Sequence, residues 1–206
     1  DFRRGTVRFT PKVEGLYALT LEVSDSGATP KVVEETFQVR VAASAFVFVA
    51  PDGADAEGRG SRESPFKSLA YALAHAKPDQ LIMLRRGEYA TGRFVLNDQT
   101  AKQLLAYPDE VVTLDLKRET ITVNSTTTPA VRLEELDIIH VGQYGIFSDP
   151  STEGLVVRHV RFVDGTEGEA ARENPAFIHG RGDNARAWRH KLLVQDNDFG
   201  TYVMRS

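Results

Sequence analysis

The sequence of 206 residues contains no cysteine, which excludes disulfide bonds and thiolate metal sites. It also has no apolar run long enough to span a membrane. The net charge of −4 is spread without long blocks of one sign, which argues against nucleic acid as a partner. Residues 1–5 lack the composition of a signal peptide, and we expect the natural chain to begin earlier. The hydrophobic content of 41% is ordinary for a globular protein with a core.

A pattern of apolar residues returns three times in the second half of the sequence. Its copies begin at Val131, Leu155 and Leu192, so the intervals are 24 and 37 residues, and the longer interval is one period plus an insertion of 13. Each copy contains two short alternating stretches, which predict strands with one buried side, separated by an extra residue that predicts a bend. Such a repeat predicts a solenoid, and a right-handed parallel β-helix with rungs about 4.8 Å apart fits best. In the third copy Asn197 replaces an inward apolar residue, and we expect its amide to bond to the backbone.

The N-terminal residues predict a different kind of β-structure. Three alternating stretches within residues 6–41 are separated by turn residues. A β-sandwich needs about seven strands, so three strands make only part of one. The strings Gly15-Leu16-Tyr17 and Val23-Ser24-Asp25 resemble the closing half of PKD-type or cadherin-like modules. We therefore expect residues 1–43 to be the C-terminal strands of an immunoglobulin-like module and residues 44–206 to be the N-terminal rungs of the β-helix.

A single substantial helix is predicted over residues 64–76. Ser64 is suited to the N-cap and Pro65 to the first helical position. Apolar residues follow at helical spacing until Pro78. The open end of a β-helix exposes its apolar interior and unpaired strand groups, so this helix is expected to cap the first rung. The side chains expected to be buried beneath it are Phe66, Leu69 and Leu73.

Residues 46–206 resemble the pectate-lyase-like superfamily of parallel β-helix proteins. The resemblance rests on Val49-Ala50-Pro51, on Ser64-Pro65-Phe66-Lys67-Ser68-Leu69, on Gly87-x-Tyr89 and on Tyr107-Pro108-Asp109-Glu110. It implies an all-β architecture in which a capping helix covers the first rung. The superfamily includes lyases, hydrolases, epimerases and non-enzymatic adhesins, so the resemblance leaves the activity open. The third copy of the repeat ends close to Ser206, and we expect further rungs to follow in the natural protein.

Charged residues at outward positions provide the candidate site. In register, Asp137, Arg161 and Asp198 would stack on successive rungs as a carboxylate–guanidinium–carboxylate ladder. Such a ladder is either a charge-balanced, solvated surface or part of a substrate site, and the sequence leaves both open. The 13-residue insertion is expected to project as a loop, and loops often carry function. His179 and Asp183 are therefore further candidates for substrate binding, although His179, which follows Phe177-Ile178, is better explained as a histidine at a strand end.

The resemblance implies a chemistry for these candidates. β-Helix lyases hold Ca²⁺ with acidic side chains and remove a sugar-ring proton with Arg or Lys, whereas hydrolases of this shape use paired carboxylates. Ca²⁺ is thus the cofactor that the resemblance implies, while no two histidines have the short spacing of a transition-metal site. We expect a secreted or cell-surface protein, of the bacterial exported kind, that binds or acts on an acidic polysaccharide; an enzyme would be a polysaccharide lyase or glycoside hydrolase. The alternative is a non-catalytic adhesin or structural stalk.

Overall fold

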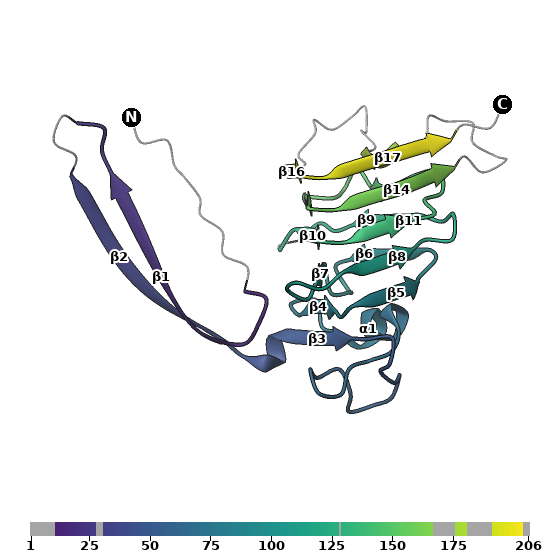
Figure 1. The fold of residues 1–206 in the computed structure, drawn as a ribbon, viewed down its shortest axis with the longest axis horizontal. Helices are drawn as coiled ribbons and strands as arrows, with labels where there is room; N and C mark the ends of the chain where they lie inside the picture. The colour runs from purple at the N-terminus through teal and green to yellow at the C-terminus, as the bar shows by residue number, and fades with distance from the viewer. Residues whose placement is uncertain (1–10, 28–30, 128, 167–175, 181–190, 204–206) are drawn as a thin grey trace. The chain divides into compact units, whose positions relative to one another are not determined.

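The computed structural model describes residues 11–27, 31–127, 129–166, 176–180 and 191–203. The chain divides into two compact units, Asp1–Ala45 and Phe46–Ser206. The described part of the first unit is an antiparallel hairpin of β1 (Gly15–Ser24) and β2 (Val32–Val41), followed by a short 3-10 turn, η1 (Ala43–Ala45) (Figure 1). The first predicted strand, over residues 6–10, lies outside the described residues, and the identification of the hairpin with an immunoglobulin-like module stays a prediction.

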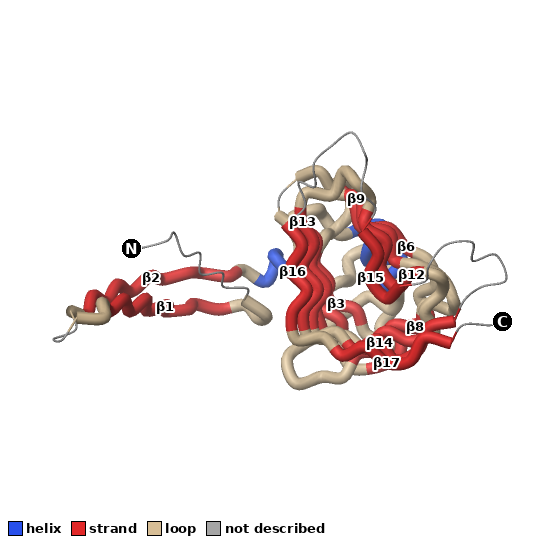
Figure 2. The backbone as a smooth tube through the Cα atoms, turned by 90° about the horizontal axis from the view of Figure 1, so that it is seen from above, coloured by secondary structure: helices blue, strands red, loops and turns tan. Residues whose placement is uncertain are grey.

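The second unit is a parallel β-helix with three parallel sheets (Figures 1 and 2). Its first two strands lie in the same sheet, and from there on consecutive strands pass from one sheet to the next. The first sheet contains β3 (Phe46–Val49), β4 (Leu81–Leu84), β7 (Gln103–Ala106), β10 (Val131–Glu134), β13 (Gly154–Arg158) and β16 (Lys191–Gln195). The second sheet contains β5 (Gly87–Ala90), β8 (Val112–Asp115), β11 (Asp137–Ile139), β14 (Arg161–Thr166) and β17 (Asp198–Val203). The third sheet contains β6 (Phe94–Asn97), β9 (Ile121–Asn124), β12 (Tyr144–Ser148) and β15 (Ala176–Gly180). The predicted all-β class and the β-helix are confirmed.

The register of the strands follows the repeat in the sequence. Val131 pairs with Leu155, and Leu155 pairs with Leu192, so the three copies of the pattern occupy three successive rungs. Asn197 turns inward at the bend of the third copy, where its Oδ1 accepts the Val160 N–H at 2.8 Å and its Nδ2 donates to the Val157 carbonyl at 2.9 Å. This confirms the predicted bonding of the inward amide, which is half-buried, to the backbone.

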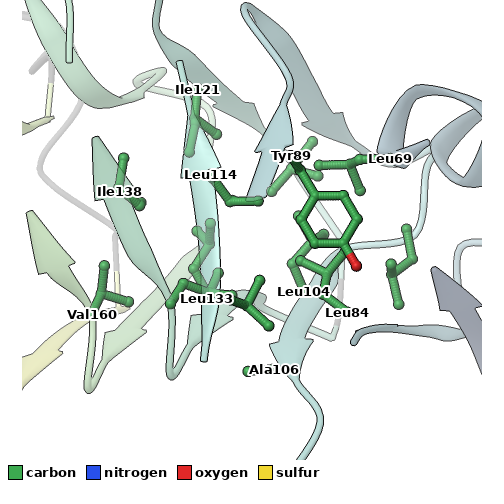
Figure 3. Packing of buried hydrophobic residues seen from close by; sticks show 14 of the residues in the cluster. Leu69, Leu84, Tyr89, Leu104, Ala106, Leu114, Ile121, Leu133, Ile138 and Val160 are labelled. Atoms are coloured by element: carbon green, nitrogen blue, oxygen red, sulfur yellow. The ribbon is translucent and has the colours of Figure 1, made fainter. Parts of the chain in front are cut away.

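Inward side chains from the three sheets meet in one core (Figure 3). In the first sheet Leu104 stacks on Leu133, and in the second sheet Leu114 stacks on Ile138, all of them fully buried. Ile121 contributes from the third sheet. Burying each such side chain contributes about 1.5–3 kcal/mol of transfer free energy. This gain explains why the alternation of apolar and polar residues along the strands of all three sheets specifies this fold.

The capping helix is shorter than the sequence predicts. Helix α1 spans Leu69–His75 and is the only α-helix within the described ranges, so the predicted start at Ser64 is wrong. Phe66 is extended instead: it forms a parallel bridge with Val49, and its N–H donates to the Phe48 carbonyl at 2.9 Å. Pairing with the edge of the first sheet satisfies the Phe66 backbone in a way that an isolated first helical turn would not.

The N-cap lies at Ser68, whose hydroxyl accepts the Tyr71 N–H at 3.1 Å. The Asp55 carboxylate accepts the N–H groups of Lys67 and Ser68, both at 2.9 Å, and fixes the entry to the helix. The helix packs against β3, at the N-terminal end of the solenoid. The side chains of Phe66 and Leu69 are buried as predicted, whereas Leu73 is only half-buried. No helix of the described residues is long and apolar enough to cross a membrane.

Candidate functional site on the second sheet

The outward side of the second sheet carries a row of polar and charged side chains. Glu88 pairs in register with Thr113, Thr113 with Asp137, Asp137 with Arg161, and Arg161 with Asp198. Because neighbouring strands are about 4.8 Å apart, the row runs along the solenoid with one polar group on each rung. The structure therefore brings the predicted Asp137, Arg161 and Asp198 together on one surface, which we call the ladder.

Within the ladder, Arg161 is held by Asp137. Its Nε donates to Oδ1 of Asp137 at 3.0 Å, and its Nη2 pairs with Oδ2, so the contact is bidentate. The hydrogen bonds and the charge of Asp137 raise the pKa of Arg161, and Asp198 adds to the effect. The Arg161 side chain is 55% exposed, so the guanidinium is accessible, but it retains its proton. Arg161 is therefore suited to bind an anion and unsuited to act as a base.

A second cluster lies at the carboxyl ends of the second-sheet strands. Asp115 Oδ1 lies 2.9 Å from Nδ1 of His140 and accepts the backbone N–H of Lys117 at 2.8 Å. The ammonium of Lys117 lies 3.7 Å from Oδ2 of the same carboxylate. The backbone N–H of His140 donates to Oδ1 of Asp164 at 2.7 Å. Burial raises the pKa of Asp115, but the hydrogen bonds from Lys117 and His140 outweigh it and hold the pKa below the usual value.

The spacing of ionisable residues in the sequence indicates this cluster, but a prediction that follows only the apolar positions does not find it. Asp115 and His140 are 25 residues apart, and His140 and Asp164 are 24 apart, which is the period of the rungs. The residues therefore stack because the repeat places them at equivalent positions. A search for ionisable residues at the repeat period would have found Asp115, His140 and Asp164 together.

Left-handed backbone conformations mark both borders of the second sheet. In the described chain, seven non-glycine residues have positive φ, and every one is ionisable. Four lie in the turns that lead into second-sheet strands, which we call the acidic border: Asp109, Glu135, His159 and Asp196. Three lie in the turns that leave these strands, which we call the basic border: Lys117, Arg118 and His140.

These conformations carry a free-energy cost. A left-handed residue with a Cβ costs roughly 1–2 kcal/mol relative to the right-handed form, and glycine largely avoids this cost. Asp and His adopt the conformation more readily than other residue types, but Lys117, Arg118 and Glu135 do not belong to that group. Backbone strain of this kind clusters at functional sites, so the basic border is the stronger indication of function.

Backbone hydrogen bonds fix the turns of the basic border against each other. The Arg118 N–H donates to the His140 carbonyl at 2.7 Å, and the Gly142 N–H donates to the Glu119 carbonyl at 3.2 Å. A Cβ on Gly142 would lie 2.2 Å from the Arg118 carbonyl oxygen, so only glycine permits this approach. The side chains of Lys117, Arg118 and His140 therefore project from two turns that pack directly against each other.

Of the remaining two predicted residues, His179 is not part of this surface. His179 lies on β15 of the third sheet, where it pairs with Phe147. Its ring stacks on the rings of Phe147 and Tyr144, with centroids 5.6 and 4.4 Å apart. The structure thus places His179 in an aromatic column on another side of the β-helix. Asp183 lies outside the described residues.

The Ca²⁺ that the resemblance implies stays a prediction. Among the described residues, no group of three or more His, Asp or Glu side chains is placed to hold a metal ion. Both carboxylate oxygens of Asp137 are occupied by Arg161. Calcium ligands are carboxylate and carbonyl oxygens that converge on one point, and the ladder instead alternates acid and base.

Comparison with known proteins gives no match: no family model, no curated protein and no solved structure matches the chain. The structure supports a parallel β-helix preceded by an antiparallel hairpin, and the resemblance to pectate-lyase-like proteins stays a prediction beyond that architecture.

Proposed function

We propose that the β-helix unit belongs to a secreted or cell-surface protein and binds an acidic polysaccharide along the outward side of its second sheet. The observation that carries the proposal is the row of ionisable side chains on three successive rungs, Asp137, Arg161 and Asp198, bordered by further charged residues. A linear polymer with repeated charges is the type of ligand that can contact several equivalent rungs at once. Repeated weak contacts of this kind add through effective concentration.

The charges on the surface suit an anionic glycan with hydroxyl groups. Lys117, Arg118 and Arg161 are exposed cations that can bind carboxylate groups. Asp137, which is half-buried, and the exposed Asp198 can accept hydrogen bonds from sugar hydroxyls. The aromatic column at His179 lies on another sheet and is not part of the proposed surface.

Binding is better supported than hydrolysis. Asp137 and Asp198 lie two rungs apart, so their backbones are separated by roughly 10 Å. Paired carboxylates in glycosidases are about 5–9.5 Å apart, and here Arg161 stands between them. A lyase activity would need a base other than Arg161. If the protein is an enzyme, lyase chemistry on uronates remains the better candidate of the two.

A non-catalytic adhesin or structural stalk is the second candidate. The observation that favours it is the mutual neutralisation of the ladder, in which Arg161 is already paired with Asp137. An exposed ion pair of this kind contributes little to stability because water screens it, and it needs no ligand to explain it.

The test is direct binding of uronate oligosaccharides to the chain, with and without Ca²⁺, by isothermal titration calorimetry. Arg161→Gln should weaken binding, whereas Arg59→Gln, an exposed arginine near the cap, should leave it unchanged. Release of unsaturated products, measured by ultraviolet absorbance, would identify a lyase. Absence of both binding and cleavage across a broad panel of acidic glycans would reject the proposal in favour of the adhesin or stalk.

A further inference from the structure

The basic border combines two independent features. Lys117, Arg118 and His140 adopt left-handed backbone conformations, with φ of 50°, 65° and 48°. Two of them also contact one carboxylate: the Lys117 ammonium and the His140 ring lie 3.7 and 2.9 Å from the two different oxygens of Asp115. The turns are fixed by backbone hydrogen bonds, so the cations are held together without needing a ligand to order them.

We propose that the basic border is a pH-dependent subsite for the anionic groups, carboxylate or sulfate, of an acidic polysaccharide. This inference rests on the proposed function, because it names where the anionic groups of that ligand bind. The side chain of His140 is about half exposed, and in the part of the chain that the structure describes its Nε2 has no hydrogen-bond partner. One side of the ring is therefore held by Asp115 while the other remains available to a ligand.

The charge balance explains the pH dependence. The charged residues on the turns around His140 are Asp115, Asp164 and Glu119 as anions and Lys117 and Arg118 as cations, and Arg93 lies 3.7 Å from Glu119. These six sum to zero, so the cluster is neutral while His140 is neutral and gains one positive charge when His140 is protonated. Histidine is the side chain that ordinarily changes charge between pH 5 and 8. Carboxylate and sulfate groups of a glycan remain anionic over that range. Binding should therefore strengthen as the pH falls from 7.5 to 5.5.

The decisive variant is Lys117→Gly/Arg118→Gly. Glycine adopts positive φ without a Cβ clash, so this double variant should fold at least as well as the wild type. Its affinity for an oligogalacturonate should fall by about tenfold, since each exposed charge pair lost typically costs a factor of roughly two to five. A heparin oligosaccharide tests sulfate in the same way, and neutral dextran controls for uncharged contacts. Lys77→Gln/Arg59→Gln removes two exposed cations elsewhere on the unit and should leave the affinity unchanged.

His140→Gln tests the pH dependence. The ratio of affinities at pH 5.5 and 7.5 should fall to about one in this variant. In His159→Gln the ratio should persist, because His159 belongs to the acidic border and lies 3.5 Å from Asp196. Loss of the ratio in His159→Gln but not in His140→Gln would overturn the assignment of the switch.

The outcomes separate this inference from the proposed function. If the wild type binds neither charged probe at either pH, the proposed function fails, and the subsite fails with it. In another outcome the wild type binds, and binding is weakened by Arg161→Gln but not by Lys117→Gly/Arg118→Gly. The ligand then lies on the ladder, and the subsite alone is rejected. Binding that is weakened by the glycine variant, with unchanged thermal stability, supports the subsite.

Discussion

Asp98 anchors the loop that connects the third sheet to the first sheet. Its carboxylate accepts hydrogen bonds from the hydroxyl groups of Ser125, Thr126 and Thr127, each at 2.7 Å. The ammonium of Lys102 lies 3.3 Å from Oδ1, and the Lys102 residue is 1% exposed. The hydrogen bond from Thr127 lowers the pKa of Asp98 most; burial opposes this, but the bonds from Ser125 and Thr126 add to it and keep the pKa well below the usual value. Asp98 is therefore an ionised counter-charge for a buried cation.

Asp98→Asn should destabilise the unit strongly. The amide keeps the shape but supplies one acceptor oxygen in place of two, and it leaves Lys102 without its anion. Lys102 would retain its contacts to Thr127 Oγ1 at 2.8 Å and to the Thr127 carbonyl at 3.0 Å. Breaking a buried ion pair by removing one partner costs about 3–5 kcal/mol. The expected result is a decrease of the urea midpoint by roughly 1–2 M, measured by far-ultraviolet circular dichroism.

The same variant should change the response to acid. Because the folded pKa of Asp98 is depressed, its contribution to stability is present above the unfolded pKa of about 4 and is lost as the pH falls through the folded value. The wild type should lose this contribution below about pH 4, and Asp98→Asn should already lack it at neutral pH. Asp79→Asn, at an exposed position, should change the free energy of unfolding by less than about 0.5 kcal/mol. If Asp98→Asn also stays within that range at pH 7, the argument from the buried cation is wrong.

Two further predictions test the packing of the rungs. Gly142→Ala should destabilise the unit clearly, because its Cβ would lie 2.2 Å from the Arg118 carbonyl oxygen. The control is Gly92→Ala, whose Cβ would meet no atom within 4 Å and which should cost only about 1 kcal/mol. Equal decreases of the melting temperature in the two variants would reject the steric argument. Leu133→Ala should lower the free energy of unfolding in urea by about 2–5 kcal/mol because the side chain is fully buried. Val111→Ala, at 61% exposure, should be nearly neutral. A decrease below about 1 kcal/mol for Leu133→Ala would contradict its place in the core.

The β-helix could be predicted because the apolar pattern that specifies it is periodic. Inward positions must be apolar on every rung, so Leu133 and Val157 recur at the same offset and pair as the sequence predicts. The ladder could be predicted by the same reasoning, since Asp137 and Arg161 have the offset of the rung. Periodicity therefore specifies both which residues face inward and which outward residues become neighbours.

The error at the cap shows where local signals fail. Ser64 and Pro65 favour the start of a helix, but the segment lies beside a sheet edge with unpaired groups. Pairing of Phe66 with Val49 satisfies those groups, and the helix can begin only after Ser68. Local propensity predicted the existence of the helix, and a tertiary contact decided where it begins.

The borders could not be predicted from residue types alone. Left-handed turns are usually signalled by glycine or asparagine, and the turn at Lys117 and Arg118 contains neither. Its conformation follows from the stacking of one turn on the next, which appears only when the rungs are assembled. The insertion around Asp183 has no counterpart in the other copies of the repeat, so periodicity gave no register for it.

The two borders of the second sheet differ in how their charges are balanced. Along the acidic border and the ladder, charge alternates from rung to rung: one rung has Glu135 with Asp137, the next has His159 with Arg161, and the third has Asp196 with Asp198. Such alternation places opposite charges about 4.8 Å apart and stabilises the stack without a ligand. The basic border instead concentrates Lys117, Arg118 and His140 on two adjacent turns in conformations that glycine would adopt at lower cost. Charge pairing therefore accounts for the ladder and for the contacts of Lys117 and His140 with Asp115. It does not explain why cationic residues occupy backbone conformations that favour glycine, and a bound anion is our proposal for that.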